Sequence, residues 1–169
     1  LPGCCALITA LTLSGLPTRR FCFEAFLPAD KKERRAILEE LQRETRTIIL
    51  YEAPHHLKKT LEELMSVLGN RRITLCRELT KKFETIQPTT LEEAISYYQE
   101  HEPKGEYVLV LEGADRKRLE QEEQLKWQEM SVKEHMELYE SQGMDSKEAM
   151  KRVAKDRGVS KRDIYQSLL

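Results

Sequence analysis

The sequence predicts an α/β fold in which five strands of one sheet are interleaved with helices, followed by a small helical appendage. Two patterns support this. Between Phe21 and Leu111, short β-branched or aromatic runs alternate with amphipathic stretches at helical spacing. After Gly113 these runs stop and the composition becomes charged and polar. A length of 169 residues with 40% apolar residues suits one modest domain plus an appendage.

Each element of the expected domain has a local signal. An apolar run that stops at Gly15 indicates the first helix. Pro54 at a first helical position, Gly69 after a last turn and a capping box at Thr90 mark the ends of further helices. The expected strands are 21–27, 47–51, 73–76, 83–87 and 107–111, and the expected helices are 4–13, 31–44, 54–68 and 90–100. These signals leave the order of the strands open.

The C-terminal part divides into two expected segments. We place the α/β domain at 1–113, a charged linker at 114–130 and a helical tail at 131–169. The linker is expected to be either helical or partly disordered. In the tail, Gly158-Val159-Ser160 followed by Ile164-Tyr165 has the spacing of a helix-turn-helix motif. Seven basic residues stand against three acidic ones from Lys147 to Asp163, so phosphate contacts would concentrate there.

Composition excludes several classes of protein. With 34% charged residues and a net charge of −1, the chain is not a uniformly basic nucleic-acid binder. Its four cysteines form no C-x-x-C pair, so we expect reduced thiols, no metal site and a cytoplasmic location. The apolar run near the N-terminus is too short to span a bilayer and has no basic flank, so we expect no membrane contact. No glycine-rich nucleotide loop is present either.

Three segments resemble the C-terminal half of a methyltransferase of the tetrapyrrole methylase superfamily. They are Pro2-Gly3-Cys4-Cys5-Ala6 running to Ser14-Gly15-Leu16-Pro17, then Tyr51-Glu52-Ala53-Pro54-His55-His56, and Arg77-Glu78-Leu79-Thr80-Lys81. They are most similar to the branch that methylates a ribose 2′-hydroxyl of a cytidine in bacterial 16S rRNA. Cys4 stands where proline is usual, and His56 stands where arginine is common, which weakens a phosphate contact there.

The resemblance implies a mixed five-stranded sheet, S-adenosylmethionine (SAM) as methyl donor and a homodimer that acts on the small ribosomal subunit. It also implies that a preceding domain with the cofactor loop is missing, so we expect the isolated chain to be inactive and to bind SAM weakly. By position, the SAM contacts would be Leu50, Tyr51, Cys76, Leu111 and Glu112. The alternative is that these are simply core strand residues.

The same resemblance implies roles for charged side chains. Lys81 and Glu52 are candidates for the base, and Arg77 or Lys81 would face an RNA phosphate or the SAM carboxylate, with Glu78 fixing their geometry. The alternative is an ion-pair network that braces a strand. The expected RNA contacts are Lys31, Lys32, Arg34 and Arg35 after Phe26-Leu27-Pro28, and Lys151, Arg152, Lys161 and Arg162 in the tail. For the first of these clusters, the alternative is a solvated face of a helix.

Two other functions stay open from the sequence. One keeps the fold but makes a tetrapyrrole carbon the methyl acceptor, and the basic tail disfavours it. The other is a non-catalytic nucleic-acid-binding module that uses only the C-terminal helices. It predicts nucleic-acid affinity in the tail alone and no dependence on SAM.

Overall fold

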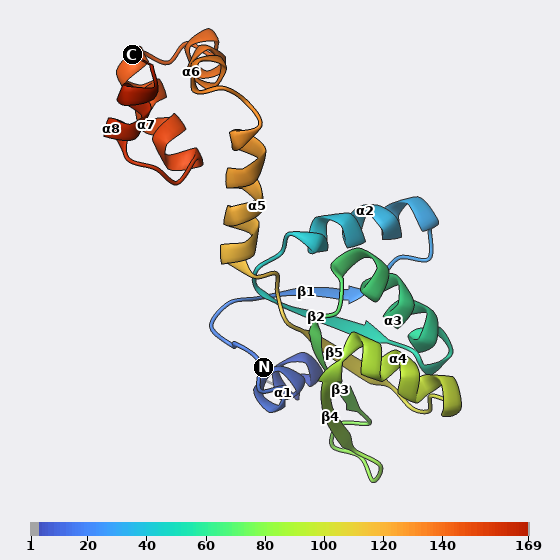
Figure 1. Ribbon diagram of the computed structural model, residues 1–169. Coiled ribbons are helices and arrows are strands. Elements are labelled where there is room, and N and C mark those ends of the chain that lie inside the picture. The colour runs from blue at the N-terminus through green and yellow to red at the C-terminus, as the bar shows by residue number, and fades with distance from the viewer. Residues whose placement is uncertain (1–3, 169) are drawn as a thin grey trace. The chain divides into compact units, whose positions relative to one another are not determined.

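The computed structural model describes residues 4–168 and divides the chain into two compact units that meet between Ala114 and Asp115 (Figure 1). The first unit is built on one five-stranded sheet. Its strands are β1 (Phe21–Phe26), β2 (Thr47–Glu52), β3 (Arg72–Arg77), β4 (Thr85–Thr90) and β5 (Tyr107–Leu111). Their order across the sheet is β1-β2-β5-β3-β4. Only β1 and β2 run parallel to each other, so the sheet is mixed, as expected.

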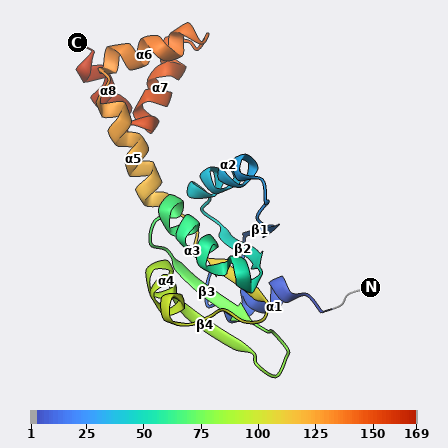
Figure 2. The same cartoon turned by 90° about the vertical axis from the view of Figure 1, so that its right-hand side faces the viewer.

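Helices cover both faces of this sheet. They are α1 (Ala6–Leu13), α2 (Lys31–Gln42), α3 (Pro54–Leu68) and α4 (Leu91–Glu100). Three of them, α2, α3 and α4, supply apolar side chains to the larger core on one face, whereas α1 packs on the other face (Figure 2). Strand residues alternate between the two cores because successive side chains of a strand point to opposite faces. Ile48 and Leu50 belong to the larger core, and Ile49 belongs to the smaller one.

The local signals correctly located most helix ends. Pro54 occupies the first turn of α3, Gly69 caps its end, and the capping box between Thr90 and Glu93 is formed. The expected strand at 83–87 was displaced, since β4 runs from Thr85 to Thr90. Its pairing with β3 extends it to the residue that caps α4. The expected opening at Pro2 and Gly3 lies outside the described residues.

The second unit is helical. It contains α5 (Arg116–Gln128), α6 (Val132–Ser141), α7 (Ser146–Asp156) and α8 (Lys161–Ser167). The segment expected to be a linker thus forms the regular helix α5. A small core of buried side chains joins α6, α7 and α8, with Val153 and Ile164 at its centre. Among the described residues, no helix is both long and apolar enough to span a bilayer.

Candidate functional site

The carboxyl ends of β1, β2 and β3 meet at one edge of the sheet. Tyr51 and Cys76 both pair with Val108 of the intervening strand β5, from opposite sides. Phe26 pairs with Tyr51 on the outer side. Three of the predicted SAM contacts, Leu50, Tyr51 and Cys76, therefore lie in adjacent rows at this edge, which we call the carboxyl edge. Such edges are where α/β sheets commonly bind ligands.

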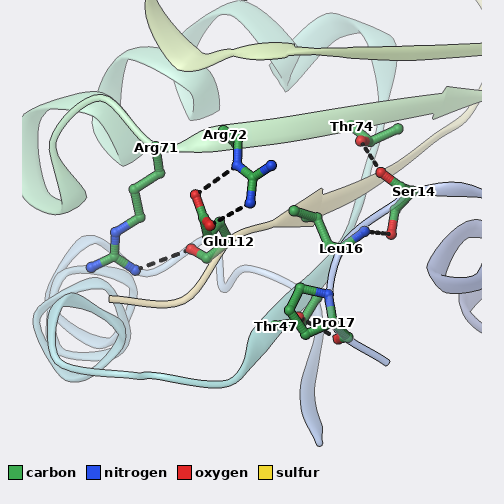
Figure 3. A network of polar contacts seen from close by, with 8 residues as sticks. All are labelled: Ser14, Leu16, Pro17, Thr47, Arg71, Arg72, Thr74 and Glu112. Carbon is green, nitrogen blue, oxygen red and sulfur yellow. Dashed lines mark hydrogen bonds and ion pairs between the residues drawn. The ribbon is translucent and has the colours of Figure 1, made fainter. Parts of the chain in front are cut away.

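The other two predicted SAM contacts lie at the opposite edge. Because β5 runs antiparallel to its neighbours, Leu111 pairs with Ile48 and Ile73, at the starts of β2 and β3. That is roughly 10 Å along the strand from Tyr51. Figure 3 shows Glu112 held by the guanidinium of Arg72 through two bonds of 3.0 and 2.6 Å. The structure therefore does not bring Leu111 and Glu112 together with the other three residues.

The side chain of Glu78 fixes the turn that follows β3. Its carboxylate accepts hydrogen bonds from the backbone N–H of Glu106, at 2.9 Å, and from the ammonium of Lys81, at 3.2 Å. These bonds lower the pKa of Glu78, with the backbone bond as the main cause. Lys81 also contacts the Glu106 carboxylate at 2.8 Å. Its pKa is raised, first by Glu106 and then by Glu78, so Lys81 is a protonated cation at neutral pH.

The backbone of this turn is strained at two residues. Glu78 and Thr80 have φ values of 52° and 65°, in the left-handed region that L-residues avoid. Strained residues of this kind gather at ligand sites and persist only when the surroundings hold them. Here the Glu84 carboxylate accepts a bond from the backbone N–H of Thr80 at 2.6 Å. The Glu78 carboxylate accepts from Glu106 and Lys81, so acidic side chains hold the turn.

Arg77 carries an unsatisfied donor. Its Nη2 donates to the carbonyl of Phe83 at 3.3 Å. Its Nε–H is buried and has no hydrogen-bond partner among residues 4–168. An unpaired buried donor costs about 1–3 kcal/mol, so it points to an acceptor that these residues do not supply. The sequence alone indicated a role for Arg77 but not which atom would carry it.

Glu52 is buried, and each of its carboxylate oxygens accepts a hydrogen bond. One carboxylate oxygen accepts from the backbone N–H of Ala53 at 2.8 Å, and the other accepts from the Thr60 hydroxyl. That hydroxyl in turn accepts from Arg34 at 2.7 Å, and Arg34 also pairs with Glu63 at 2.6 Å. The network connects the end of β2 to α3 and α2. Arg34 therefore points inward, with only 13% of its side chain exposed, and is not part of a surface patch.

The other basic residues of α2 remain at the surface. Lys31, Lys32 and Arg35 are exposed, and Arg35 pairs with Glu39 at 2.7 Å. A groove of about 680 Å³ lies between α2 and α3, with Lys31, Arg34, Arg35 and Lys59 among its lining residues. On α3, His55 and His56 are both exposed, and their ring centroids are 4.1 Å apart.

Cys76 is buried and Cys22 is partly buried in the sheet of the first unit. Burial is the main cause that raises the pKa of the Cys76 thiol to about 11, and the same holds for Cys22. Both are therefore protonated at neutral pH and are poor nucleophiles. Within residues 4–168, no three His, Cys, Asp or Glu side chains gather in a way that would hold a metal ion.

The second unit presents its basic residues on α7 and α8. Lys147, Lys151 and Lys155 recur every four residues, so they form one exposed stripe along α7. Of the four tail residues predicted to contact RNA, Lys151, Lys161 and Arg162 are exposed without an ion pair among the described residues. The fourth, Arg152, lies 3.5 Å from the Asp156 carboxylate. The four-residue spacing of Lys147, Lys151 and Lys155 can be seen in the sequence, but the candidate RNA contacts predicted from it did not include Lys147 and Lys155.

Comparison with known proteins identifies the family. A sequence model of the tetrapyrrole (corrin/porphyrin) methylases matches residues 1–95. The chain belongs to this family, which matches the resemblance found in the sequence. The matched range lies wholly in the first unit.

Related proteins share a name. The ribosomal RNA small subunit methyltransferase I of Halalkalibacterium halodurans is 48% identical over 165 residues, which cover 98% of this chain and 56% of that protein. The protein of that name from Bacillus subtilis is 45% identical over 167 residues, which cover 99% and 57%. The chain thus spans a little over half the length of these relatives. The solved structure of the methyltransferase CobJ aligns with a TM-score of 0.48 and 22% identity, covering 67% of this chain and 49% of that one.

Proposed function

We propose that this chain forms one wall of a methyltransferase site that transfers a methyl group from SAM to a ribose 2′-hydroxyl of a cytidine in 16S rRNA. The observation that carries the proposal is the carboxyl edge, where Tyr51, Cys76 and Arg77 end two strands beside a strained turn. The name shared by the relatives supports the choice of substrate. The homodimer, the cytoplasmic location and the preceding domain expected from the sequence belong to the same proposal.

The residues at this edge fit the carboxylate of SAM. The buried Nε–H of Arg77 is a charged donor that lacks an acceptor among the described residues, and a carboxylate would supply one. When bound, SAM supplies an electrophilic methyl group. The work left to this chain is to hold donor and acceptor in line.

In this proposal neither Lys81 nor Glu52 acts as the base, and each has another role. Because its pKa is raised by two carboxylates, Lys81 stays protonated and is suited to an RNA phosphate. Both oxygens of Glu52 already accept hydrogen bonds, so this side chain positions the start of α3. We therefore assign the role of base to neither residue.

RNA would be held at two places outside the methyl-transfer site. Lys31 and Lys32 are exposed at the start of α2, next to the carboxyl end of β1. The lysine stripe of α7 and the exposed Lys161 and Arg162 of α8 provide a second phosphate-binding surface. Like charges at this spacing disfavour a helix by a few tenths of a kcal/mol per pair, a cost that bound phosphates would remove.

The test uses this chain extended to the full length of its relatives. Tritium transfer from labelled SAM is measured on small ribosomal subunits that lack ribose methylation, with a porphyrinogen acceptor in parallel. Arg77→Ala should lower transfer about a hundredfold without lowering the melting temperature. Arg72→Ala is the matched control, since this arginine lies at the opposite end of the same strand, and it should transfer label at the wild-type rate.

Each other outcome counts against part of the proposal. Loss of cooperative melting in Arg77→Ala would make this side chain a structural brace. Label on the porphyrinogen would make the enzyme a tetrapyrrole methylase. Label on neither acceptor would favour a non-catalytic nucleic-acid-binding module.

A further inference from the structure

Three aromatic side chains form a cluster at the carboxyl ends of β1 and β2. The ring of Tyr51 meets Phe23 edge-to-face, with centroids 4.9 Å apart, and meets Phe26 in the same manner at 5.6 Å. Tyr51 is half-buried, whereas Phe23 and Phe26 are 40% and 60% exposed. Full burial of one such ring is worth about 1.5–3 kcal/mol, so two exposed phenylalanines side by side are a cost to the isolated chain.

A bulge in β1 creates this cluster. In a regular strand, residues three apart point to opposite faces, so Phe23 and Phe26 would be separated by the sheet. The register shifts between Phe23 and Ala25, which places Phe23 opposite Ile49 and Phe26 opposite Tyr51. Both phenylalanines then share the face of Tyr51. Bulges beside functional sites commonly re-aim a side chain in this way.

The bulge has an energetic cost of its own. Ala25 has a φ of 52°, in the left-handed region. The non-glycine residues with positive φ among the described residues are Ala25, Glu78 and Thr80, and all three lie at the carboxyl edge. The strained backbone at Ala25, next to Phe26, therefore lies at the same edge of the sheet as the strained turn beside the proposed methyl-transfer site. A surface that has a strained backbone and exposed aromatic rings lowers the stability of the fold, so we expect it to bind a ligand.

The charges nearby favour a nucleic acid as that ligand. Lys31 and Lys32 are exposed, make no ion pair among the described residues, and follow Phe26 after a short loop. They begin α2, which packs on the face of the sheet opposite to the rings, so the rings and these cations share the carboxyl edge without a contact between them. Exposed rings and unpaired cations at one edge fit an unpaired nucleotide strand, since bases stack on aromatic side chains while lysines contact phosphates. An interface with another protein segment would bury the rings equally well but would leave these two lysines without a role.

We propose that Phe23, Phe26 and Tyr51 form a stacking surface for an unpaired base of the RNA substrate, next to the nucleotide that receives the methyl group. This inference rests on the proposed function. It names residues that hold the acceptor strand by aromatic stacking, in addition to the phosphate contacts expected of Lys31 and Lys32. A base adjacent to the target would then be held flat against the protein, which would orient the ribose toward the donor.

The experiment uses this chain and a short single-stranded RNA that carries one 2-aminopurine, whose fluorescence falls when it stacks. Phe26→Leu keeps an apolar side chain of similar size but removes the ring, whereas Phe26→Trp keeps a ring. We expect Phe26→Leu to weaken RNA binding at least about fivefold and to abolish the quenching, because stacking contributes about 1–3 kcal/mol per base. Phe26→Trp should bind and quench at least as well as the wild type.

Tyr97→Ala is the matched control. Tyr97 is 43% exposed and belongs to α4, which packs on the opposite face of the sheet, so its loss should leave affinity and quenching unchanged. Equal binding by Phe26→Leu and wild type would overturn the inference. So would a change of sedimentation in Phe26→Leu without a change in RNA affinity, because the rings would then belong to a protein interface.

The methyl-transfer assay answers a separate question. If no RNA accepts label but quenching still depends on the ring at position 26, the proposed function fails while the stacking surface stands as a nucleic-acid contact. If RNA accepts label at a rate that Phe26→Leu does not change, the proposed function stands and the inference fails.

Discussion

The two units hold themselves together by different means. The first unit buries large aliphatic side chains on both faces of a sheet. Buried polar groups of that unit such as Thr74 and Glu52 have hydrogen-bond partners, whereas Nε of Arg77 has none among the described residues. The second unit has a small core and encloses one histidine, His135, whose Nε2 has no hydrogen-bond partner among the described residues. Stability that comes from a large core tolerates local damage better than stability that comes from a few contacts.

The helix starts show the same contrast. All four helices of the second unit have a side-chain cap, from Asp115, Ser131, Asp145 and Ser160. In the first unit, α1 and α3 begin without one. Caps contribute about 1 kcal/mol each, which matters most where the core is small. The uncapped start of α3 directly follows β2, at the carboxyl edge.

The largest expected effect comes from core truncation in each unit. Ile164 and Leu109 are 1% and 0% exposed, so replacing either with alanine should cost about 2–5 kcal/mol. We expect Ile164→Ala to unfold the second unit while the first stays folded, and Leu109→Ala to lower the stability of the first unit without unfolding it. Amide hydrogen exchange, followed unit by unit, measures both. Simultaneous loss of protection in the two units would break the comparison.

Glycine substitutions should give a smaller difference. A Cβ at Gly113 would lie 2.4 Å from the backbone carbonyl carbon of Thr45, so Gly113→Ala must displace the chain as it leaves β5. Overpacking of this kind costs about 1–3 kcal/mol. Gly143 in the second unit has a φ of +89° and open space around it, so Gly143→Ala should cost only about 1 kcal/mol from backbone strain. Urea titrations rank the two, and a larger loss for Gly143→Ala would contradict the packing argument.

Stability should also respond to pH differently in the two units. His135 stacks on Trp127 with centroids 4.1 Å apart, accepts from Arg157 at 3.2 Å and lies 3.8 Å from Asp156. Burial, with Arg157 adding to it, lowers the pKa of His135, although Asp156 opposes the shift. The unfolded chain then binds a proton more readily than the folded chain. The second unit should therefore be most stable above pH ~6.5 and lose stability as pH falls below it.

The first unit should not respond in that range. Its strongly shifted carboxylate, Glu44, has a pKa lowered to about 2, mainly by a hydrogen bond from Arg46, so that contribution is lost only below pH ~4.5. NMR titration of the histidine signals, together with melts of each unit between pH 7 and 5, measures the contrast. His101→Gln in the first unit is the control. A His135 that titrates at its ordinary value would remove the basis of this prediction.

Local signals were enough to predict most of the fold. Helix ends at Pro54, Gly69 and Thr90 depend on backbone chemistry that acts within a few residues, and the structure confirms them. The start of β4 was wrong because pairing with β3, rather than propensity, determines where this strand runs. Strand order was equally out of reach, since it depends on contacts between residues far apart in the chain.

Strand direction explains what the sequence missed at the site. Treating every strand end as equivalent grouped Glu112 with Tyr51, but the antiparallel course of β5 separates them. Arg34 was counted with its neighbours because a run of basic residues does not show which one turns inward to Glu63. The aromatic cluster depends on a bulge at Ala25, and no local sequence pattern predicts this bulge.

The smallest expected effect concerns residues with positive φ. In the second unit both are glycines, Gly143 and Gly158, whereas in the first unit Ala25 adopts such a conformation at the carboxyl edge. Ala25→Gly removes a Cβ penalty of about 1–2 kcal/mol but makes the unfolded chain more flexible, at a cost of about 0.4–1 kcal/mol. We expect a net gain of about 0.5 kcal/mol, measured by urea titration. A loss of stability would show that the alanine methyl group supports the bulge, and the strain at the carboxyl edge would then be smaller than its backbone angle implies.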